Sequence, residues 1–361
     1  MRIVGRLMAV SLCVALAISI AGCGHKKVHA KGGLAVAADP SVVGTVTVYT
    51  STPKTQADRY LADFQRQYPN VKLSVVTSTP AGIVAQVIKE KKKPVADVIW
   101  HTPLSAVYAA DEATALASYV YHPGQYDAVQ ANYSDPDQSD KPFVTGTDAR
   151  LVGWAVNTSK TGGAAPRSFA DLTDSKYSGL IVMPSVNTDA GYTMVSLLLS
   201  TDGEDTGWAY LDQLDKNVDH YTNDENAPTQ AVADGSVGVG IGWDKQVTDA
   251  ANSGGSAQAV FPGLPEMSPY DIDVDALVAK PAPANAAKTF LEWAISDDAM
   301  NLYAADTPIT SVEEGSVLAP GYPTSNSDQL MQNADWGYMA DNHAKIVADW
   351  MKRYGKKIKS Q

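Results

Sequence analysis

The amino-acid sequence predicts an α/β fold, in which short parallel strands alternate with helices that cover both faces of a sheet. Three strand–loop–helix units open the folded region, with strands at 45–50, 71–77 and 96–100. Each strand is short and rich in apolar or β-branched residues, and each ends in a loop with hydroxyl residues and proline that precedes a helix. Parallel strands are expected here, because a helix between two strands returns the chain to the starting edge of the sheet.

The same unit occurs twice more between residues 179 and 244. Apolar strands at 180–184 and 220–222 each lead into small and polar residues and then into a helix. Ligands bind at the carboxyl ends of strands in α/β sheets, and helix N-termini add unpaired N–H groups and a positive dipole end. We therefore expect this stretch to form half of a binding cleft.

The remaining elements are expected from hydrophobic periodicity and from glycine and proline. Ser51 and Thr52 offer a hydroxyl N-cap for the first helix, which runs to Gln67. A long surface loop is expected at 119–141. Further helices are expected at 83–93, 104–111, 284–294, 297–304 and 335–353, and further strands at 151–157, 237–244, 257–261 and 269–278.

Composition limits the class of protein. The chain has 361 residues, of which 45% are hydrophobic and 19% charged, as is typical of a globular protein of about two domains. Its formal net charge is −12 and its pI about 4.9. We expect no nucleic-acid partner and no general affinity for an anionic membrane, because like charges repel.

The first residues are typical of an export signal. Arg2 and Arg6 form a basic region, an apolar stretch follows at 7–20, and small residues then lead to Cys23. This order resembles the signal of bacterial lipoproteins, so we expect residues 1–22 to be removed and Cys23 to carry lipid. A transmembrane anchor, or a cleaved signal with an incidental cysteine, is the alternative. Residues 23–43 would then be the lipidated cysteine and a flexible tether.

The folded part is not expected to be an enzyme. Cys13 lies in the signal and Cys23 at the new N-terminus, so no disulfide, cysteine nucleophile or thiolate metal site is available. The histidines lack the H-E-x-x-H spacing of zinc proteases, and no serine stands in a G-x-S-x-G turn. We predict no catalytic residue, no metal and no cofactor.

Three alternating aspartates could suggest a calcium loop. Asp271, Asp273 and Asp275 have the D-x-D-x-D spacing, but such a loop needs glycine at position 276 and glutamate at 282. Both positions are alanine. We therefore reject the calcium loop and expect a strand edge or a hinge.

The order of motifs resembles a known family. VTVYTSTP near the mature N-terminus is followed by ADVIW, GLIVMPSVNTDAGYT, GWAYLDQLDKNV, APTQAVADGSVGVGIGWD, PYDIDVDALV and AAKTFLEWAISDDAM. Together these segments, from Thr45 to Trp350, resemble the extracellular solute-binding proteins of ABC importers. The most similar branch includes binders of ferric ion, 2-aminoethylphosphonate, phosphosugars and thiamine.

This resemblance implies a two-lobed periplasmic-binding-protein fold of type 2, which closes on its ligand like a flytrap about a hinge of crossing strands. The crossings are expected at 148–152 and 271–275. The expected first lobe comprises residues 44–147 and 274–310. The expected second lobe, with the C-terminal helices, comprises residues 148–273 and 311–361.

The resemblance also implies which residues line the cleft. They follow the strand ends of both lobes and the return crossing. The expected ligand-binding residues are Ser51, Thr52, Thr79, Gly82, His101, Thr102, Asn187, Thr188, Gly191, Tyr192, Asn223, Asn226, Ala227, Trp243, Asp244, Tyr270 and Asp271.

The sequence departs from parts of this family in ways that bear on the ligand. Gly242 and Trp243 stand where ferric binders carry adjacent tyrosines, which disfavours iron because Trp has no ligand atom. Asp189, Asp224 and Glu225 stand where binders of anions have small residues. These acids could face the cleft and favour a cationic ligand, or they could only complement helix dipoles.

The expected protein is a monomer, anchored by lipid on Cys23 outside a bacterial cytoplasmic membrane. It would capture a small charged solute and deliver it to an ABC permease and its ATPase. An aminophosphonate-like zwitterion ranks first among solutes, and an organic cation such as thiamine or a polyamine second. The alternatives are a ferric-ion-binding protein and a ligand-sensing receptor subunit without transport.

Overall fold

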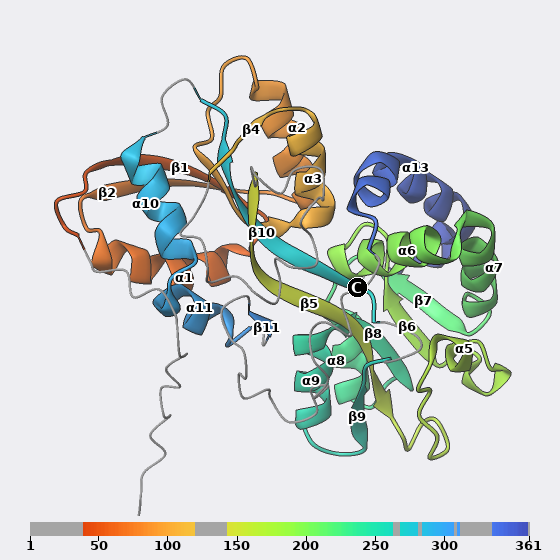
Figure 1. Cartoon of the computed structure of the whole chain (residues 1–361). Helices are drawn as coiled ribbons and strands as arrows, with labels where there is room; N and C mark the ends of the chain where they lie inside the picture. Colours follow the sequence, from red (N-terminus) through yellow and green to blue (C-terminus); the bar gives the residue numbers. More distant parts are fainter. Residues whose placement is uncertain are drawn as a thin grey trace, which may run out of the picture.

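The computed structural model describes residues 39–119, 143–262, 268–280, 284–306, 309–310 and 334–359. The predicted signal, Cys23, most of the tether and the predicted surface loop after Tyr119 lie outside these residues. In the described part of the chain, two lobes are joined by two central strands, β5 and β10 (Figure 1). No helix in these ranges is both long and apolar enough to span a bilayer.

The first lobe contains the predicted strand–helix units, which are confirmed. Strands β1, β2 and β3 run parallel, with α1 and α10 on one face and α2 and α3 on the other (Figure 1). Its elements are β1 Gly44–Thr50, α1 Lys54–Gln67, β2 Val71–Thr77, α2 Pro80–Glu90, β3 Val98–Pro103, α3 Leu104–Glu112, β4 Leu116–Ala117, α10 Asn285–Ala294 and α11 Asp297–Tyr303.

The second lobe repeats the pattern with parallel strands β6, β7 and β8. Helices α6 and α7 lie on one side of these strands, and α8 and α9 on the other (Figure 1). Its elements are α5 Phe169–Leu172, β6 Ile181–Pro184, α6 Asp189–Asp202, α7 Glu204–Leu214, β7 Val218–Thr222, α8 Ala227–Ala233, β8 Val239–Trp243, α9 Asp244–Asn252 and β9 Ala257–Val260.

One of the two central strands, β5, changes its pairing partner between the lobes. β5 (Val144–Asn157) runs antiparallel to β10 (Tyr270–Val278) in a sheet of strand order β2-β1-β3-β10-β5-β8-β6-β7. Up to Leu151, β5 pairs with β10, and from Val152 it pairs with β8. This change of partner lies within the crossing predicted at 148–152. β10 is an interior strand, so its aspartates lie at the crossing and not at a strand edge.

The last helix contacts both lobes. α13 (Trp336–Tyr354) begins beside α3 and continues along α6 (Figure 1). A two-residue strand, β11 (Ile309–Thr310), pairs with β5.

Two local predictions in the first lobe are wrong. Pro53 occupies the N-cap position of α1, and no side chain caps this helix. Thr52 is buried, and its hydroxyl instead donates to the carbonyl oxygen of His101 at 3.2 Å. His101 and Thr102, expected in a loop, belong to the buried end of β3. The Thr52 hydroxyl, which the local pattern assigned to a helix cap, therefore bonds to a residue of a neighbouring strand instead.

Candidate functional site

A cavity of about 150 Å³ lies between the first and second lobes. Its walls come from the starts of α2, α3 and α6, the first residues of β10 and the middle of α13. The polar lining residues are Thr79, Ser105, Asn187, Thr188, Asp189, Tyr192, Thr193, Asp271 and His343. The apolar lining residues are Pro80, Ala81, Pro103, Ala106, Val186 and Val347.

Helix N-termini from both lobes face this cavity. Thr79 caps α2 by accepting a hydrogen bond from the Gly82 N–H, and Thr188 caps α6 by accepting from the Gly191 N–H, both at 3.2 Å. The first turn of a helix carries N–H groups without partners inside the helix and the positive end of its dipole. The cavity therefore offers partial positive charge from two directions.

The start of α3 is used by a carboxylate of the protein. Asp271 accepts hydrogen bonds from the Ser105 hydroxyl at 2.5 Å and from the Ser105 N–H at 3.3 Å, and Thr193 donates at 3.4 Å. Burial raises the pKa of Asp271 to about 6, although Ser105 and Arg150 oppose the shift. Asp271 thus brings negative charge to the cavity wall and is held rigidly there.

Asp189 is the second carboxylate of the cavity wall. It lies in the first turn of α6, half-buried, and the described residues include no hydrogen-bond donor to its side chain. Burial and then the charge of Glu225 raise the pKa of Asp189 to about 7, while Arg150 lowers it. An ammonium group in the cavity would stabilise the ionised form of this carboxylate, which burial and Glu225 disfavour.

The sequence did not decide whether Asp189, Asp224 and Glu225 face the cleft or complement helix dipoles, and the structure gives them different roles. Asp189 lines the cavity, whereas Glu225 accepts a hydrogen bond from the Ala190 N–H at 2.6 Å and so complements the start of α6. Asp224 is exposed and accepts a hydrogen bond from the Asn226 N–H at 2.9 Å within its own loop. Only Asp189 is thus placed to meet a ligand in the cavity.

Arg150 is engaged by the protein beside this cavity. Its Nε lies 2.9 Å from Asp273 Oδ2 and its Nη2 lies 3.0 Å from Asp273 Oδ1. The guanidinium also stacks on the Trp243 ring, with its carbon atom 4.4 Å from the ring centroid. Two of the five N–H donors of Arg150 therefore face Asp273, and this buried carboxylate balances the charge that Arg150 would otherwise offer to an anionic ligand.

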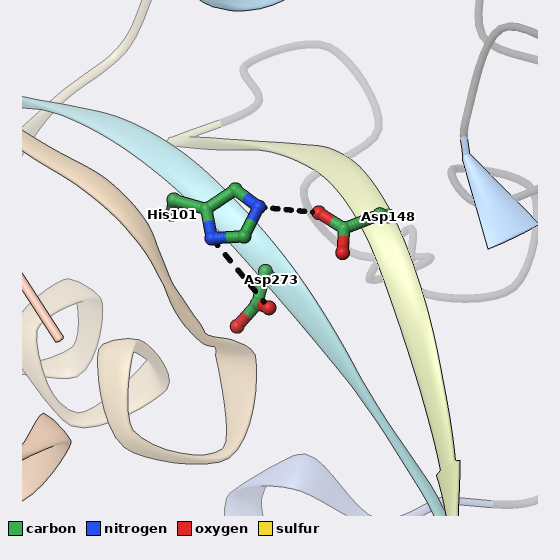
Figure 2. Close-up of side chains that lie close together, drawn as sticks. All are labelled: His101, Asp148 and Asp273. Atoms are coloured by element: carbon green, nitrogen blue, oxygen red, sulfur yellow. Dashed lines mark ion pairs between the residues drawn. The ribbon is translucent and has the colours of Figure 1, made fainter. Parts of the chain in front are cut away.

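His101 lies between two aspartates at the crossing of β5 and β10 (Figure 2). Its Nε2 is 2.9 Å from Asp148 Oδ1, and its Nδ1 is 3.8 Å from Asp273 Oδ2. Burial lowers the pKa of His101, but the charges of Asp148 and Asp273 outweigh this effect and raise the pKa to about 9. The side chain is therefore an imidazolium ion, buried and ion-paired.

The same cluster has the residue types of a metal site. Ligand atoms of His101, Asp148 and Asp273 lie within 4.8 Å of one another. The two carboxylates, however, approach different nitrogens of the ring (Figure 2), and one ion cannot bind both sides of an imidazole. Arg150 also occupies both oxygens of Asp273. The geometry fits a charge cluster better than a chelate.

The backbone at His101 has an unusual conformation. Its φ is +47°, which lies in the left-handed region that most side chains avoid. The His101 N–H donates to Asp275 Oδ1 at 2.9 Å, and this bond holds the strained residue in place. All three aspartates of β10 therefore contact groups at the junction of the lobes, as a hinge role predicts.

The structure brings some of the predicted site residues together at the cavity. Those that line it come from the start of α2, the start of α6 and the return crossing. They are Thr79, Asn187, Thr188, Tyr192 and Asp271.

The other predicted site residues lie outside the cavity lining. Cβ atoms at Gly82 and Gly191 would meet Ser78 Oγ at 2.6 Å and Ser185 O at 2.1 Å, so these glycines permit close packing. Those with buried side chains are Thr52, His101, Thr102, Trp243, Asp244 and Tyr270. Those half-buried or exposed are Ser51, Asn223, Asn226 and Ala227. Their binding roles remain predictions.

Sequence reasoning missed three polar lining residues and all six apolar ones. Ser105 begins α3 one residue after Leu104, so the strand–loop–helix pattern could have found it. Thr193 lies one turn into α6, where helical periodicity would have placed it beside Asp189. His343 lies far along the chain in α13, and no local signal links it to the cleft.

The comparison with protein families agrees with this architecture. The sequence model of a family described as bacterial extracellular solute-binding protein matches residues 59–357. This match covers more than half of the chain. The chain belongs to this family. The protein is thus an extracellular solute-binding protein, which acts outside the cytoplasm, and its family consists of binding proteins rather than enzymes.

Individual relatives are distant in sequence. An uncharacterised protein of Haemophilus influenzae is 23% identical over 275 residues, which cover 75% of this chain and 78% of the relative. The periplasmic binding protein AfuA of Actinobacillus pleuropneumoniae, solved with fructose-6-phosphate, is 21% identical with a TM-score of 0.70, covering 86% of this chain and 98% of its own. Iron-bound HitA of Pseudomonas aeruginosa is 16% identical with a TM-score of 0.70, covering 84% and 98%. These structures confirm the two-lobed periplasmic-binding-protein fold.

Proposed function

We propose that this solute-binding protein captures a small solute that carries an ammonium group. The observation that supports this most directly is Asp189, a half-buried carboxylate on the cavity wall without a hydrogen-bond donor among the described residues. Asp271 adds a second carboxylate to the same wall. Burial destabilises both charges, and a bound ammonium ion restores the interaction that each lost with water.

A zwitterion fits this cavity best. The starts of α2 and α6 direct positive dipole ends toward an anionic group of the solute, although Thr79, Thr188 and Glu225 already accept hydrogen bonds from N–H groups there. Two carboxylates and two helix starts thus face one small volume. A zwitterion of aminophosphonate type satisfies both sets, so we rank it first. An organic cation such as thiamine or a polyamine satisfies the carboxylates alone and ranks second.

Ferric ion ranks third. HitA was solved with iron bound, but the family resemblance places Trp243 where ferric binders carry a tyrosine, and in this chain Arg150 stacks on the Trp243 ring. Tyr192 lines the cavity, yet its hydroxyl donates to the Met339 carbonyl oxygen, and burial raises its pKa above the usual range. A tyrosine that must lose its proton to bind Fe³⁺ is therefore poorly prepared to do so. A receptor role without transport would use the same cavity and stays an alternative.

We further propose that residues 1–22 are a cleaved signal and that lipid on Cys23 anchors a monomer to the outside of the membrane. The order of basic residues, apolar stretch and cysteine supports this. A flexible tether up to residue 43 would let the two lobes reach a permease. We propose residues 44–147 with 274–310, and 148–273 with 311–361, as the units that close on the solute.

The direct test is calorimetric titration of the domain from Gly24 onward. The ligands would be 2-aminoethylphosphonate, ethylphosphonate without the amine, putrescine, thiamine and Fe³⁺. We expect 2-aminoethylphosphonate to bind more tightly than ethylphosphonate, and Asp189→Asn to lower its affinity by about tenfold to a hundredfold, as expected for loss of a charge-assisted contact of about 1.5–3 kcal/mol.

The control is Asp224→Asn, since Asp224 is exposed in a neighbouring loop of the same lobe. This variant should bind like the wild type. Equal affinity for the two phosphonates, or tight binding of Fe³⁺ alone, would show that the ammonium proposal is wrong while leaving the solute-binding role in place.

A further inference from the structure

The C-terminal helix α13 connects the two lobes across the cavity. Near its start, α13 packs on α3 of the first lobe, and Trp336 and Met339 join the apolar core of that lobe. The Trp336 ring also packs edge-on against Tyr270 of β10 at 5.4 Å between centroids. Near its end, Trp350 packs against Tyr221 of β7 at 4.7 Å. The middle of the helix is therefore held in a defined position relative to both lobes (Figure 1).

His343 lies between these two anchored ends and lines the cavity. Its ring lies 4.6 Å from that of Tyr192, centroid to centroid, at an interplanar angle of 49°. The Tyr192 hydroxyl donates to the carbonyl oxygen of Met339, one turn before His343, so this contact ties α6 to α13. The two rings are thus in contact, and both residues line the cavity.

The imidazole of His343 has unused polar capacity. It is half-buried, and the described part of the chain provides no hydrogen-bond partner for either of its nitrogens. Burial lowers the pKa of His343, which keeps the ring uncharged at neutral pH. An uncharged ring that lines the same cavity as the two carboxylates does not repel a cation, and aromatic faces attract one.

From this placement we infer that α13 is a third wall of the binding site and that His343 contacts the bound solute, packing with Tyr192 against its ammonium end. The inference rests on the proposed function, because the ammonium group is what the two rings would recognise. According to this inference, α13 helps to select the solute as well as to connect the lobes. Solute bound there would touch three separate segments of the chain at once.

A His343 variant series tests this wall by calorimetric titration with 2-aminoethylphosphonate. We expect His343→Ala to raise the Kd by about tenfold, and His343→Phe to recover part of the loss because it keeps an aromatic face. The matched control is His220→Gln. His220 lies on β7, outside the cavity lining, and pairs with Asp219. It should leave the Kd unchanged.

Thermal unfolding of each ligand-free variant shows whether it is folded, so loss of binding is not confused with loss of structure. A His343→Ala protein that unfolds like the wild type and binds 2-aminoethylphosphonate within twofold of it would overturn the inference. Failure of the proposed function looks different. In that case the wild type would bind ethylphosphonate at least as tightly as 2-aminoethylphosphonate. If His343→Ala then left the Kd for ethylphosphonate unchanged, the role of α13 as a wall of the site would be wrong as well. If His343→Ala raised the Kd for ethylphosphonate, His343 would contact the solute, but not through an ammonium group. A wild type that binds neither phosphonate, nor putrescine, nor thiamine contradicts both.

Discussion

Arg150 and Asp273 form a two-point ion pair at the crossing of the central strands, with Nε–Oδ2 and Nη2–Oδ1 distances of 2.9 and 3.0 Å. Arg150 stands opposite Asp271 in the β5–β10 register, so its bond to Asp273 is a diagonal one. One residue further along β5, Leu151 ends the pairing with β10. The pair therefore fixes the two strands to each other where the chain passes between lobes.

Loss of this pair should destabilise the whole protein. Arg150→Met leaves Asp273 buried and paired only with His101, and breaking a buried ion pair from one side costs about 3–5 kcal/mol. Urea denaturation measures the free energy of unfolding. Arg353→Met is the control, because its ion pair with Asp212 is solvent-exposed and should contribute less than about 1 kcal/mol. Equal effects of the two variants would contradict the structural role of the hinge pair.

The stability of the charge cluster should depend on the proton of His101. Its pKa is raised to about 9 from 6.5, so this group stabilises the fold below pH 6.5, and the contribution disappears as pH rises through 9. Wild type and His101→Gln would be unfolded in urea at several pH values between 6 and 10. The stability difference between them should shrink as pH rises. A difference that is constant over this range would mean that His101 is neutral in the native protein.

Affinity for an ammonium solute should rise with pH. The pKa values of Asp189 and Asp271 are raised to about 7 and about 6, so the free protein carries protons there at acidic pH. In the ligand-free protein, these raised values also mean that stability falls as pH rises from about 4 through 7. An ammonium ion binds the ionised carboxylates, so binding near pH 6 should release protons.

Calorimetry of 2-aminoethylphosphonate binding in buffers of different ionisation enthalpy measures this proton release. Asp189→Asn should remove most of it and flatten the rise of affinity between pH 5 and 8. Uptake of protons on binding would instead indicate that the solute is recognised mainly through its anionic group.

Gly191 should tolerate no side chain. A Cβ atom there would lie 2.1 Å from the Ser185 carbonyl oxygen, so Gly191→Ala must displace the start of α6 and should cost about 1–3 kcal/mol. Its solute affinity should fall with it, because Asp189 lies in the same turn. Gly337→Ala in α13 is the control, since its nearest contact would be an ordinary 3.5 Å. Should Gly191→Ala match this control in stability, the packing assigned to Gly191 is wrong.

The proposed lipid anchor makes a prediction about Cys23. In a bacterial host, the wild-type protein should take up labelled fatty acid and sediment with membranes, and Cys23→Ser should do neither. Cys13→Ser is the control, because Cys13 lies in the apolar stretch of the signal. Membrane association that persists in Cys23→Ser would favour an uncleaved transmembrane anchor.

The sequence alone was sufficient for the classes of element and for much of their order. The strands that end at Thr50 and Val278 lie where the alternation of apolar residues predicted them, and the strand that ends at Thr77 lies where the strand–loop–helix repeat predicted it. The partner change of β5 at Val152 lies in the predicted crossing. These features follow from local periodicity and from breaker residues, which act over a few residues and can be recognised without the fold.

Other features depended on contacts between distant segments. The hydroxyl of Thr52 looked like a helix cap, but in the folded chain it bonds to His101 on a neighbouring strand. From the sequence, Asp189 and Glu225 could each either face the cleft or complement a helix dipole. The structure shows that Asp189 lines the cavity, whereas Glu225 accepts a hydrogen bond at the start of α6. A local pattern cannot distinguish these cases, because the competing bond partner is many residues away.

The sequence by itself determined that this is an exported two-lobed α/β protein with the motifs of a solute-binding family. The tertiary structure decided that Arg150 is engaged by Asp273, that Asp189 faces the cavity and that His343 completes its wall. The physical reason is that secondary structure is favoured by short-range patterns, whereas the charge and lining of a cleft arise where strands and helices from both lobes meet.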